Sequence, residues 1–228
     1  MKRQVAFIHT AHAAIPPLMA YFSAAAPEYD ITNLLDEGIL RFFATGNYRA
    51  AEWRFRDLLS VARNGYSAEA VLITCSSAPI SLVRKLASEV EIPVLKIDTP
   101  LAARAVRLGA RIGVAATFRA TLEPSLELLR SAAAEIGKTI GIVPEVVDDA
   151  YTALLCGHPE DHDEMVISAV DKLANSGVDV IVLAQVSMAR VLPKLRGRYT
   201  VPVLSSVDCS LPALRECLPA RSNSGSGV

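Results

Sequence analysis

The chain has 228 residues, of which 51% are hydrophobic and 21% are charged, with a formal net charge of −1. This composition is typical of a soluble globular protein with one large domain or two smaller ones. The interspersed charges exclude the clustered basic face of a nucleic-acid-binding protein, and the sequence has no apolar run long enough to span a membrane.

The first segment superficially copies a secretory signal, because a basic pair precedes a fairly apolar stretch. Two histidines and Pro16-Pro17 interrupt that stretch. Residues 4–9 are therefore predicted to form a strand, and residues 15–26 a helix with proline in its first turn. We expect a cytoplasmic protein without a cleaved leader.

Short β-type runs alternate with amphipathic helical patterns along the rest of the chain. The predicted strands are 4–9, 28–34, 69–75, 92–97, 110–116, 140–147, 178–184 and 201–206. Several are continuously apolar, as in "VDVIVLA", which is typical of strands covered on both faces. The alternation predicts an α/β fold with mainly parallel sheets. The small polar tail, residues 219–228, is expected to be flexible.

An internal repeat relates the two halves of the sequence. "AEAVLITCSSAPISLVRKL" is similar to "GVDVIVLAQVSMARVLPKL", and each is followed by a strand that contains proline. The superposition places Cys75 on Gln185, Ser77 on Ser187 and Asp98 on Asp208. Two unrelated βαβ units would share part of this pattern. A true duplication instead predicts a cleft with a strand end from each half facing it.

The four cysteines form no C-x-x-C pair and no zinc spacing, so we expect free thiols and no metal site. Cys75 ends a strand just before a helix with Pro79 in its first turn, where free N–H groups can lower the pKa of a thiol. Cys156 and Cys217 are interpreted as packing residues. Cys209 is an outside candidate for an acid at the cleft.

Three stretches together resemble the aspartate/glutamate racemase superfamily, which includes hydantoin racemases, maleate isomerases and arylmalonate decarboxylases: "TCSSAP", "RIGVAATFRATLEPS" and "VIVLAQVSMA". The resemblance extends through residue 218. It implies two pseudo-symmetric α/β domains, each a mainly parallel sheet flanked by helices, with the active site in the cleft between them. Residues 1–97 and 208–218 would form one domain and residues 98–207 the other. A homodimer is a further expectation.

The resemblance also implies a reaction that needs no cofactor, on a small carboxylate substrate. In typical racemases of this family, two cysteines exchange the α-proton from opposite faces. Cys75 matches the first cysteine, but Gln185 stands at the second position, and an amide cannot transfer protons near neutral pH. Gln185 is expected to orient the substrate. The residues expected to bind substrate oxygens are Ser76, Ser77, Thr117, Thr121 and Ser187.

Three reactions are compatible with a single thiol. A racemase or epimerase would need another acid or base opposite Cys75, and His9 is the preferred candidate because histidine titrates near neutral pH. A cofactor-free decarboxylase of the arylmalonate type would use Cys75 only to protonate a carbanion. An isomerase of the maleate type would add the thiol to a double bond. A carboxylate-binding paralogue without activity is the non-enzymatic alternative. Of these alternatives, the racemase or epimerase is the preferred interpretation.

Other polar residues have competing interpretations. Arg119 is either a partner for a second substrate carboxylate or a solvated residue at a helix start. Asp98 and Asp208 are predicted to cap helices. His158 and His162 form either a lid or the start of the following helix, and the acidic residues between them favour the helix start.

Overall fold

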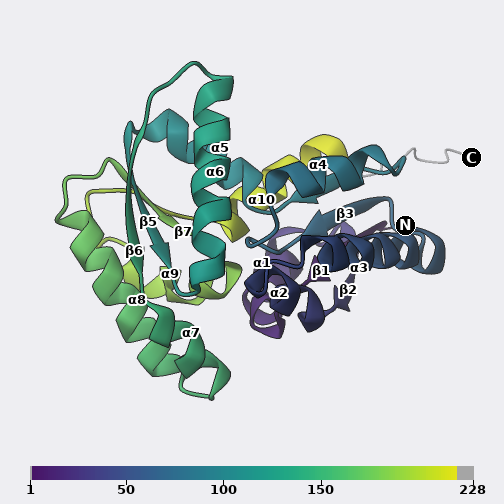
Figure 1. Cartoon of the computed structure of the whole chain (residues 1–228), viewed down its shortest axis with the longest axis horizontal. Coiled ribbons are helices and arrows are strands. Elements are labelled where there is room, and N and C mark those ends of the chain that lie inside the picture. Colours follow the sequence, from purple (N-terminus) through teal and green to yellow (C-terminus); the bar gives the residue numbers. More distant parts are fainter. Residues whose placement is uncertain (1, 220–228) are drawn as a thin grey trace, which may run out of the picture.

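The computed structural model describes residues 2–219 of the chain, which form two lobes (Figure 1). The elements up to residue 97 are β1 (Arg3–His9), η1 (His12–Ala14), α1 (Ile15–Ala25), β2 (Tyr29–Leu35), α2 (Glu37–Ala44), α3 (Tyr48–Ser60), η2 (Val61–Gly65), β3 (Ala70–Ile73), α4 (Ile80–Ser88) and β4 (Val94–Lys96). They are followed by α5 (Thr99–Leu108), β5 (Arg111–Ala116), α6 (Arg119–Glu135), β6 (Gly141–Val146), α7 (Asp148–Leu155), α8 (Pro159–Ala174), β7 (Val180–Leu183), η3 (Val186–Val191), α9 (Leu192–Leu195), β8 (Val203–Ser205) and α10 (Ser206–Cys217). Residues 220–228 of the predicted tail lie outside the described residues.

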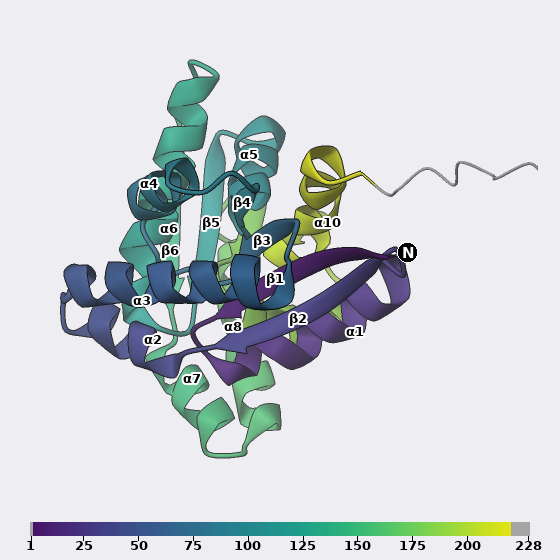
Figure 2. The ribbon, with the colours of Figure 1, turned by 90° about the vertical axis from the view of Figure 1, so that its right-hand side faces the viewer.

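The strands of residues 2–219 form two four-stranded sheets with the same order of strands. One sheet has the order β2-β1-β3-β4 and the other β6-β5-β7-β8, and all pairs are parallel. Helices flank both sheets, as Figure 2 shows in a second view. The predicted fold class, two pseudo-symmetric α/β units, is therefore confirmed.

The central strands owe their place to apolar runs. In β3 and β7, every residue of "AVLI" and "VIVL" is buried, as expected for parallel strands covered by helices on both faces. Aromatic packing reinforces the first sheet, where the rings of Phe7 and Phe22 meet edge to face with centroids 4.9 Å apart. Burial on both faces leaves only the strand ends free to carry polar, functional side chains.

The last helix returns to the first sheet. Val207, Leu211 and Leu214 of α10 belong to the same buried cluster as Val5 and Phe7 of β1. This contact packs α10 against the first sheet, and the division into domains stays a prediction. The exact boundaries at residues 97 and 208 stay predictions.

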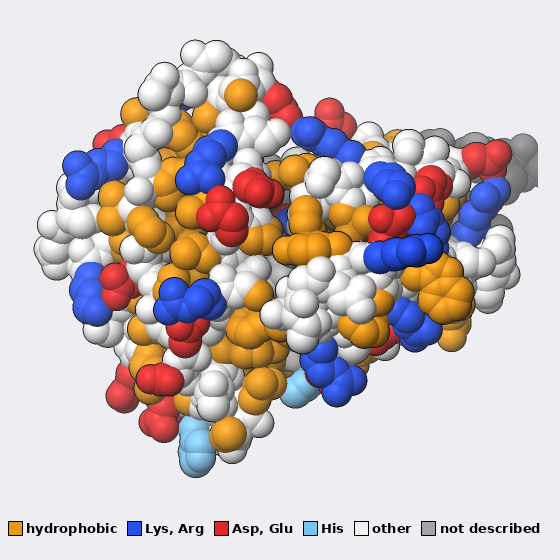
Figure 3. Space-filling view, viewed as in Figure 1, with side chains coloured by type: hydrophobic (Ala, Val, Ile, Leu, Met, Phe, Trp, Pro, Cys, Tyr) orange, Lys and Arg blue, Asp and Glu red, His pale blue; other side chains and the backbone are white. Residues whose placement is uncertain are grey.

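The surface carries no long apolar helix and no single-sign patch on the face shown. Within residues 2–219, no helix combines the length and the apolarity that crossing a lipid bilayer requires. On the face in Figure 3, Lys and Arg side chains are interspersed with Asp and Glu. Among the side chains of residues 2–219, ion pairs join Arg84 to Glu135 at 2.8 Å and Arg130 to Glu123 at 3.0 Å.

Candidate active site

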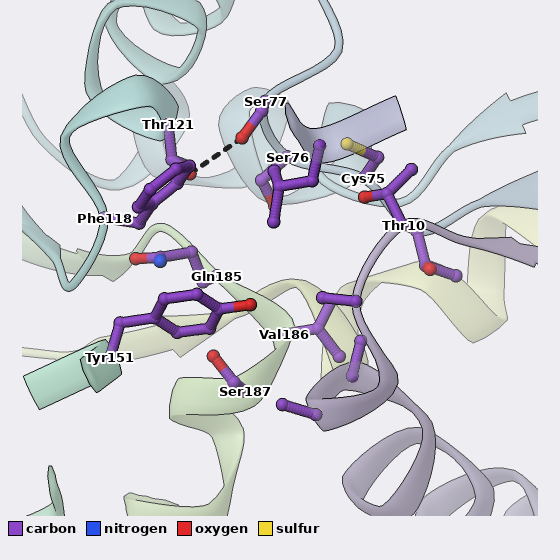
Figure 4. A pocket seen from close by; sticks show the side chains of 15 residues that line it. Thr10, Cys75, Ser76, Ser77, Phe118, Thr121, Tyr151, Gln185, Val186 and Ser187 are labelled. Carbon is purple, nitrogen blue, oxygen red and sulfur yellow. Dashed lines mark hydrogen bonds between the residues drawn. The ribbon is translucent and has the colours of Figure 1, made fainter. Parts of the chain in front are cut away.

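A small cavity of about 50 Å³ lies between the two sheets (Figure 4). Its walls come from both halves of the chain and are mostly hydroxyl-bearing, small or aromatic. The lining residues are Thr10, Ala11, Ala13, Ala14, Leu40, Thr74, Cys75, Ser76, Ser77, Phe118, Thr121, Tyr151, Gln185, Val186 and Ser187. The structure thus brings together six of the eight predicted site residues and leaves His9 and Thr117 outside the lining.

The cavity lies where the strand order reverses in both sheets, the usual ligand position in open α/β sheets. The ladders pair Ile8 with Ile73 in one sheet and Ala115 with Leu183 in the other. Counting two residues onward from each strand pair makes Cys75 equivalent to Gln185 and, on the neighbouring strands, Thr10 equivalent to Thr117. The repeat seen in the sequence therefore has a structural counterpart.

The Cys75 thiol is enclosed, with 3% of the residue exposed. Burial raises its pKa above the ordinary value, because a thiolate is less stable away from water. A hydrogen bond to Thr10, the charge of Lys96 and the backbone N–H groups of Ser77 and Ala78 act in the opposite direction. The expectation that the helix start lowers the pKa of this thiol was incomplete: the amides contribute, but burial outweighs them.

Lys96 and Asp98 form a buried ion pair beneath the Cys75 loop. Their side chains are 1% and 5% exposed, and the ammonium group also lies 3.5 Å from the carbonyl oxygen of Ser76. Asp98 precedes α5 but makes no capping hydrogen bond, so its predicted capping role was wrong. Asp208 is not the cap of α10 either, because Ser205 accepts the hydrogen bond from the Val207 N–H.

Gln185 makes a specific contact in the second half. Its Oε1 accepts a hydrogen bond from the Thr117 N–H at 2.7 Å, and its amide group is turned toward Phe118 rather than the middle of the cavity (Figure 4). The Thr117 hydroxyl is buried and has no hydrogen-bond partner within residues 2–219. The amide oxygen is therefore occupied by the protein, and the Gln185 side chain holds the Thr117 backbone instead of facing the middle of the cavity.

Hydroxyl groups supply most of the remaining polar lining. Ser77 and Thr121 join the two halves across the cavity through a hydrogen bond of 3.0 Å between their hydroxyl oxygens (Figure 4). Ser187 points its hydroxyl toward the cavity from the second half (Figure 4). Such donors can hold a carboxylate and stabilise negative charge that develops on it.

Sequence reasoning missed two residues that help to define the cavity. Thr10 lines the cavity with Cys75 and acts to lower the pKa of its thiol, and the "HT" at the end of the first strand, similar to the "AT" at residues 116–117, was the available signal. Tyr151 enters from α7, its ring packed against Phe118 with centroids 5.5 Å apart. No motif marks Tyr151, because α7 lies outside the internal repeat.

His9 lies beside the cavity rather than in its wall. Its Nε2 is 2.8 Å from Asn33 Oδ1 and its Nδ1 is 2.8 Å from Thr74 Oγ1. Both ring nitrogens are therefore engaged, and burial lowers the pKa of the imidazole. This geometry gives no support to His9 as the second acid or base.

Several secondary candidates take structural positions. Arg119 pairs with Asp148 at 2.8 Å, which ties the start of α6 to the start of α7. Cys209 is buried outside the cavity, and Cys156 is exposed, which corrects its interpretation as a packing residue. His162 is buried in α8, as the helix-start reading favoured.

Residues 2–219 contain no group of three or more His, Cys, Asp or Glu side chains suited to hold a metal ion.

Comparisons with known proteins agree with this fold. A family model described as Asp/Glu/Hydantoin racemase matches residues 31–214. The fold is similar to glutamate racemase RacE1 from Bacillus anthracis, with a TM-score of 0.75 and 14% identity over 97% of this chain and 85% of that one. The fold is also similar to allantoin racemase from Klebsiella pneumoniae, with a TM-score of 0.72 and 16% identity over 94% of this chain and 87% of that one. An unliganded arylmalonate decarboxylase has a TM-score of 0.57 and 16% identity over 99% of this chain and 97% of that one. No curated protein matches the sequence.

Proposed function

The chain belongs to the Asp/Glu/hydantoin racemase family, and we propose that it is a cofactor-independent racemase or epimerase acting at the carbon next to a carboxylate. The observation that carries the proposal is the position of Cys75 at the switch point of its sheet, in a cavity whose other polar groups are mostly hydrogen-bond donors. A thiol and convergent donors are what α-proton transfer requires.

In the proposed reaction, the substrate carboxylate lies against the hydroxyls of Ser76 and Ser187. The Cys75 thiolate removes the α-proton, and the electron pair moves onto the carboxylate oxygens as an enediolate. Fixed donors stabilise that charge without having to reorganise, which is commonly the largest contribution to catalysis of this kind. Reprotonation on the other face then inverts the carbon.

The raised pKa of Cys75 has a kinetic consequence. Its ordinary value is near 9.0, and burial moves it upward, so only a small fraction of the free enzyme carries the thiolate at neutral pH. We expect the rate constant kcat/KM to rise with pH through the alkaline range, as the thiol of the free enzyme ionises.

A cofactor-free decarboxylase is the second candidate. It is favoured by the observation that Cys75 is the one cysteine in the lining of this cavity, because protonation of a carbanion after loss of CO₂ needs a single acid. The structural similarity to arylmalonate decarboxylase is compatible with this reaction but shows only a shared fold.

The two reactions are separated by incubating the protein in D₂O with each enantiomer of aspartate and glutamate, and with phenylmalonate and maleate. NMR follows α-deuteration, CO₂ release and double-bond geometry, while polarimetry follows inversion. The racemase proposal expects deuteration with inversion of at least one acid, lost on Cys75→Ala and retained in Cys156→Ala, which removes an exposed thiol. CO₂ release without inversion would favour the decarboxylase. Binding without any turnover would leave a carboxylate-binding protein.

A further inference from the structure

Tyr151 is the titratable side chain that the second half contributes to the cavity lining. It lies on α7, and its hydroxyl points into the cavity toward the side that holds Thr10 and Cys75 (Figure 4). Within residues 2–219 this hydroxyl has no hydrogen-bond partner, although neighbouring polar groups such as Ser77 and Thr121 are paired. An uncommitted phenol in the wall of a small site is available to a ligand.

The position of the Tyr151 ring is set by contacts at the start of α6. Phe118 packs against the ring at 5.5 Å between centroids, and the ion pair of Arg119 with Asp148 joins the two helix starts. Gln185 also enters from the second half, but its amide oxygen is held by the Thr117 N–H, and an amide does not titrate near neutral pH. Tyr151 is thus better placed than Gln185 to move a proton.

We propose that Tyr151 is the proton donor on the face of the substrate opposite Cys75, an inference that rests on the proposed α-proton transfer. Cys75 Sγ takes the proton as the Cα–H bond breaks, and the electron pair forms the enediolate. The Tyr151 O–H bond then breaks as a new Cα–H bond forms on the other face, which leaves a phenolate. After product release, water passes the proton from Sγ to the phenolate oxygen and restores the starting state.

The charges around Tyr151 favour this role as an acid. Burial, the Glu37 carboxylate of α2 and the Cys75 thiolate all raise the pKa of the phenol, so it stays protonated when the thiolate is present. Arg119 of α6 and Asp148 of α7 are the nearby charges at the two helix starts, and they neutralise one another. A protonated phenol facing a thiolate is the state that turns over one enantiomer, and the other enantiomer reacts by the reverse path, from the phenolate and the protonated thiol.

Tyr151→Phe tests the proposal in D₂O with the enantiomers of aspartate and glutamate. Inversion should fall at least about 100-fold. The enantiomer whose α-proton faces Cys75 should still be deuterated, with retention of configuration and within about 10-fold of the wild-type rate. Tyr66→Phe, which changes an exposed tyrosine, is the matched control and should retain wild-type inversion. Thermal unfolding of each variant checks that it is folded.

Other outcomes overturn the proposal in distinguishable ways. Inversion by Tyr151→Phe within about 3-fold of wild type would exclude Tyr151 as the donor and leave Cys75 in place. Equal loss of deuteration from both enantiomers would assign Tyr151 to substrate binding instead. If the wild type deuterates none of these acids, the result contradicts the proposed function itself. That outcome is recognised from the wild type alone, without any Tyr151 variant.

A second measurement needs no turnover. With 3-fluorotyrosine at position 151, fluorine NMR reports the ionisation of this phenol alone. If the phenol faces Cys75, its pKa should fall in the Cys75→Ala background and rise after iodoacetate places a carboxylate on the Cys75 sulfur. A phenol pKa that responds to neither change would refute the facing geometry. If the wild type turns over a substrate, the fluorinated enzyme should also show one limb of its pH–rate profile shifted. A tyrosine with a purely structural role would leave the profile unchanged.

Discussion

The two halves of this molecule share a strand order and a ladder register but differ at the strand ends that meet in the cavity. In the first half, Cys75 shares the cavity wall with Thr10 and lies near the buried pair of Lys96 and Asp98. In the second half, Gln185 accepts a hydrogen bond from the backbone of Thr117. By register, Ser205 occupies the position of Lys96, and it caps a helix instead of carrying a charge.

The difference shows how a duplicated scaffold can keep its geometry while its two sites diverge. The first half retains an ionisable group with a cation nearby, whereas the second half supplies neutral hydrogen bonds. If catalysis still needs two proton-transfer groups, the second must come from outside the repeated segment, which is why α7 and Tyr151 enter the account.

Moving the thiol from one half to the other gives the largest expected effect. Cys75→Gln should lower α-deuteration about 10³-fold, because an amide cannot act as the base. Gln185→Cys alone should change the rate far less. Combining the two should restore weak deuteration of the opposite enantiomer, since the thiol would then face the other side of the α-carbon. If Cys75→Gln deuterated its substrate at the wild-type rate in the NMR assay, the thiol of the first half would not be the base, and the contrast between the halves would be wrong.

Removing the cation of the first half should affect stability most. Lys96→Met leaves the Asp98 carboxylate buried without its partner and should lower the free energy of unfolding by about 3–5 kcal/mol in urea titrations. Ser205→Ala, at the equivalent position of the second half, should cost only about 1 kcal/mol because it removes one helix cap. Adding Asp98→Leu to Lys96→Met should recover much of the loss. Equal losses in the two single variants would contradict this difference between the halves.

Each half also buries one histidine that should make stability depend on pH. Burial lowers the pKa of His9 and of His162 below the usual 6.5. The unfolded chain therefore binds protons first as pH falls, so the stability contribution is complete above pH 6.5 and declines below it, toward the folded pKa values. Urea unfolding at pH 7.5 and 5.5 should show this decline, and His9→Gln and His162→Gln should each reduce it. A pH-independent free energy over this range would refute the assignment.

The smallest effect concerns the contact that joins the halves. The hydroxyls of Ser77 and Thr121 are 3.0 Å apart, and a hydrogen bond of this kind contributes about 0.5–1.5 kcal/mol. A double-mutant cycle with Ser77→Ala and Thr121→Val should return a coupling free energy in that range. Additive losses would mean that the two hydroxyls are not coupled in solution.

The fold could be predicted from sequence because the evidence for it is local and repeated. Apolar strands such as "VIVL" alternate with helices, and the repeat within the sequence makes Cys75 equivalent to Gln185. Asp208 was misplaced by one residue, because the ladders make Val207 the equivalent of Asp98.

The chemistry of the site was less predictable because it depends on packing between distant segments. From the sequence alone, Asp98 is interpreted as a helix cap. Its actual partner is Lys96, because both side chains are buried and their charges must pair. The pKa of Cys75 depends on how completely the other half closes over it, which no motif encodes. Tyr151 reaches the cavity only through its packing on Phe118.

A crystal structure with the α-deuterated acid bound would test the central claim most directly. The account predicts Cys75 Sγ about 3–3.5 Å from the α-carbon on one face, with the Tyr151 hydroxyl on the other and the carboxylate on Ser76 or Ser187. An acid bound with its α-carbon remote from that sulfur, and Cys75 still enclosed by protein on every side, would contradict it.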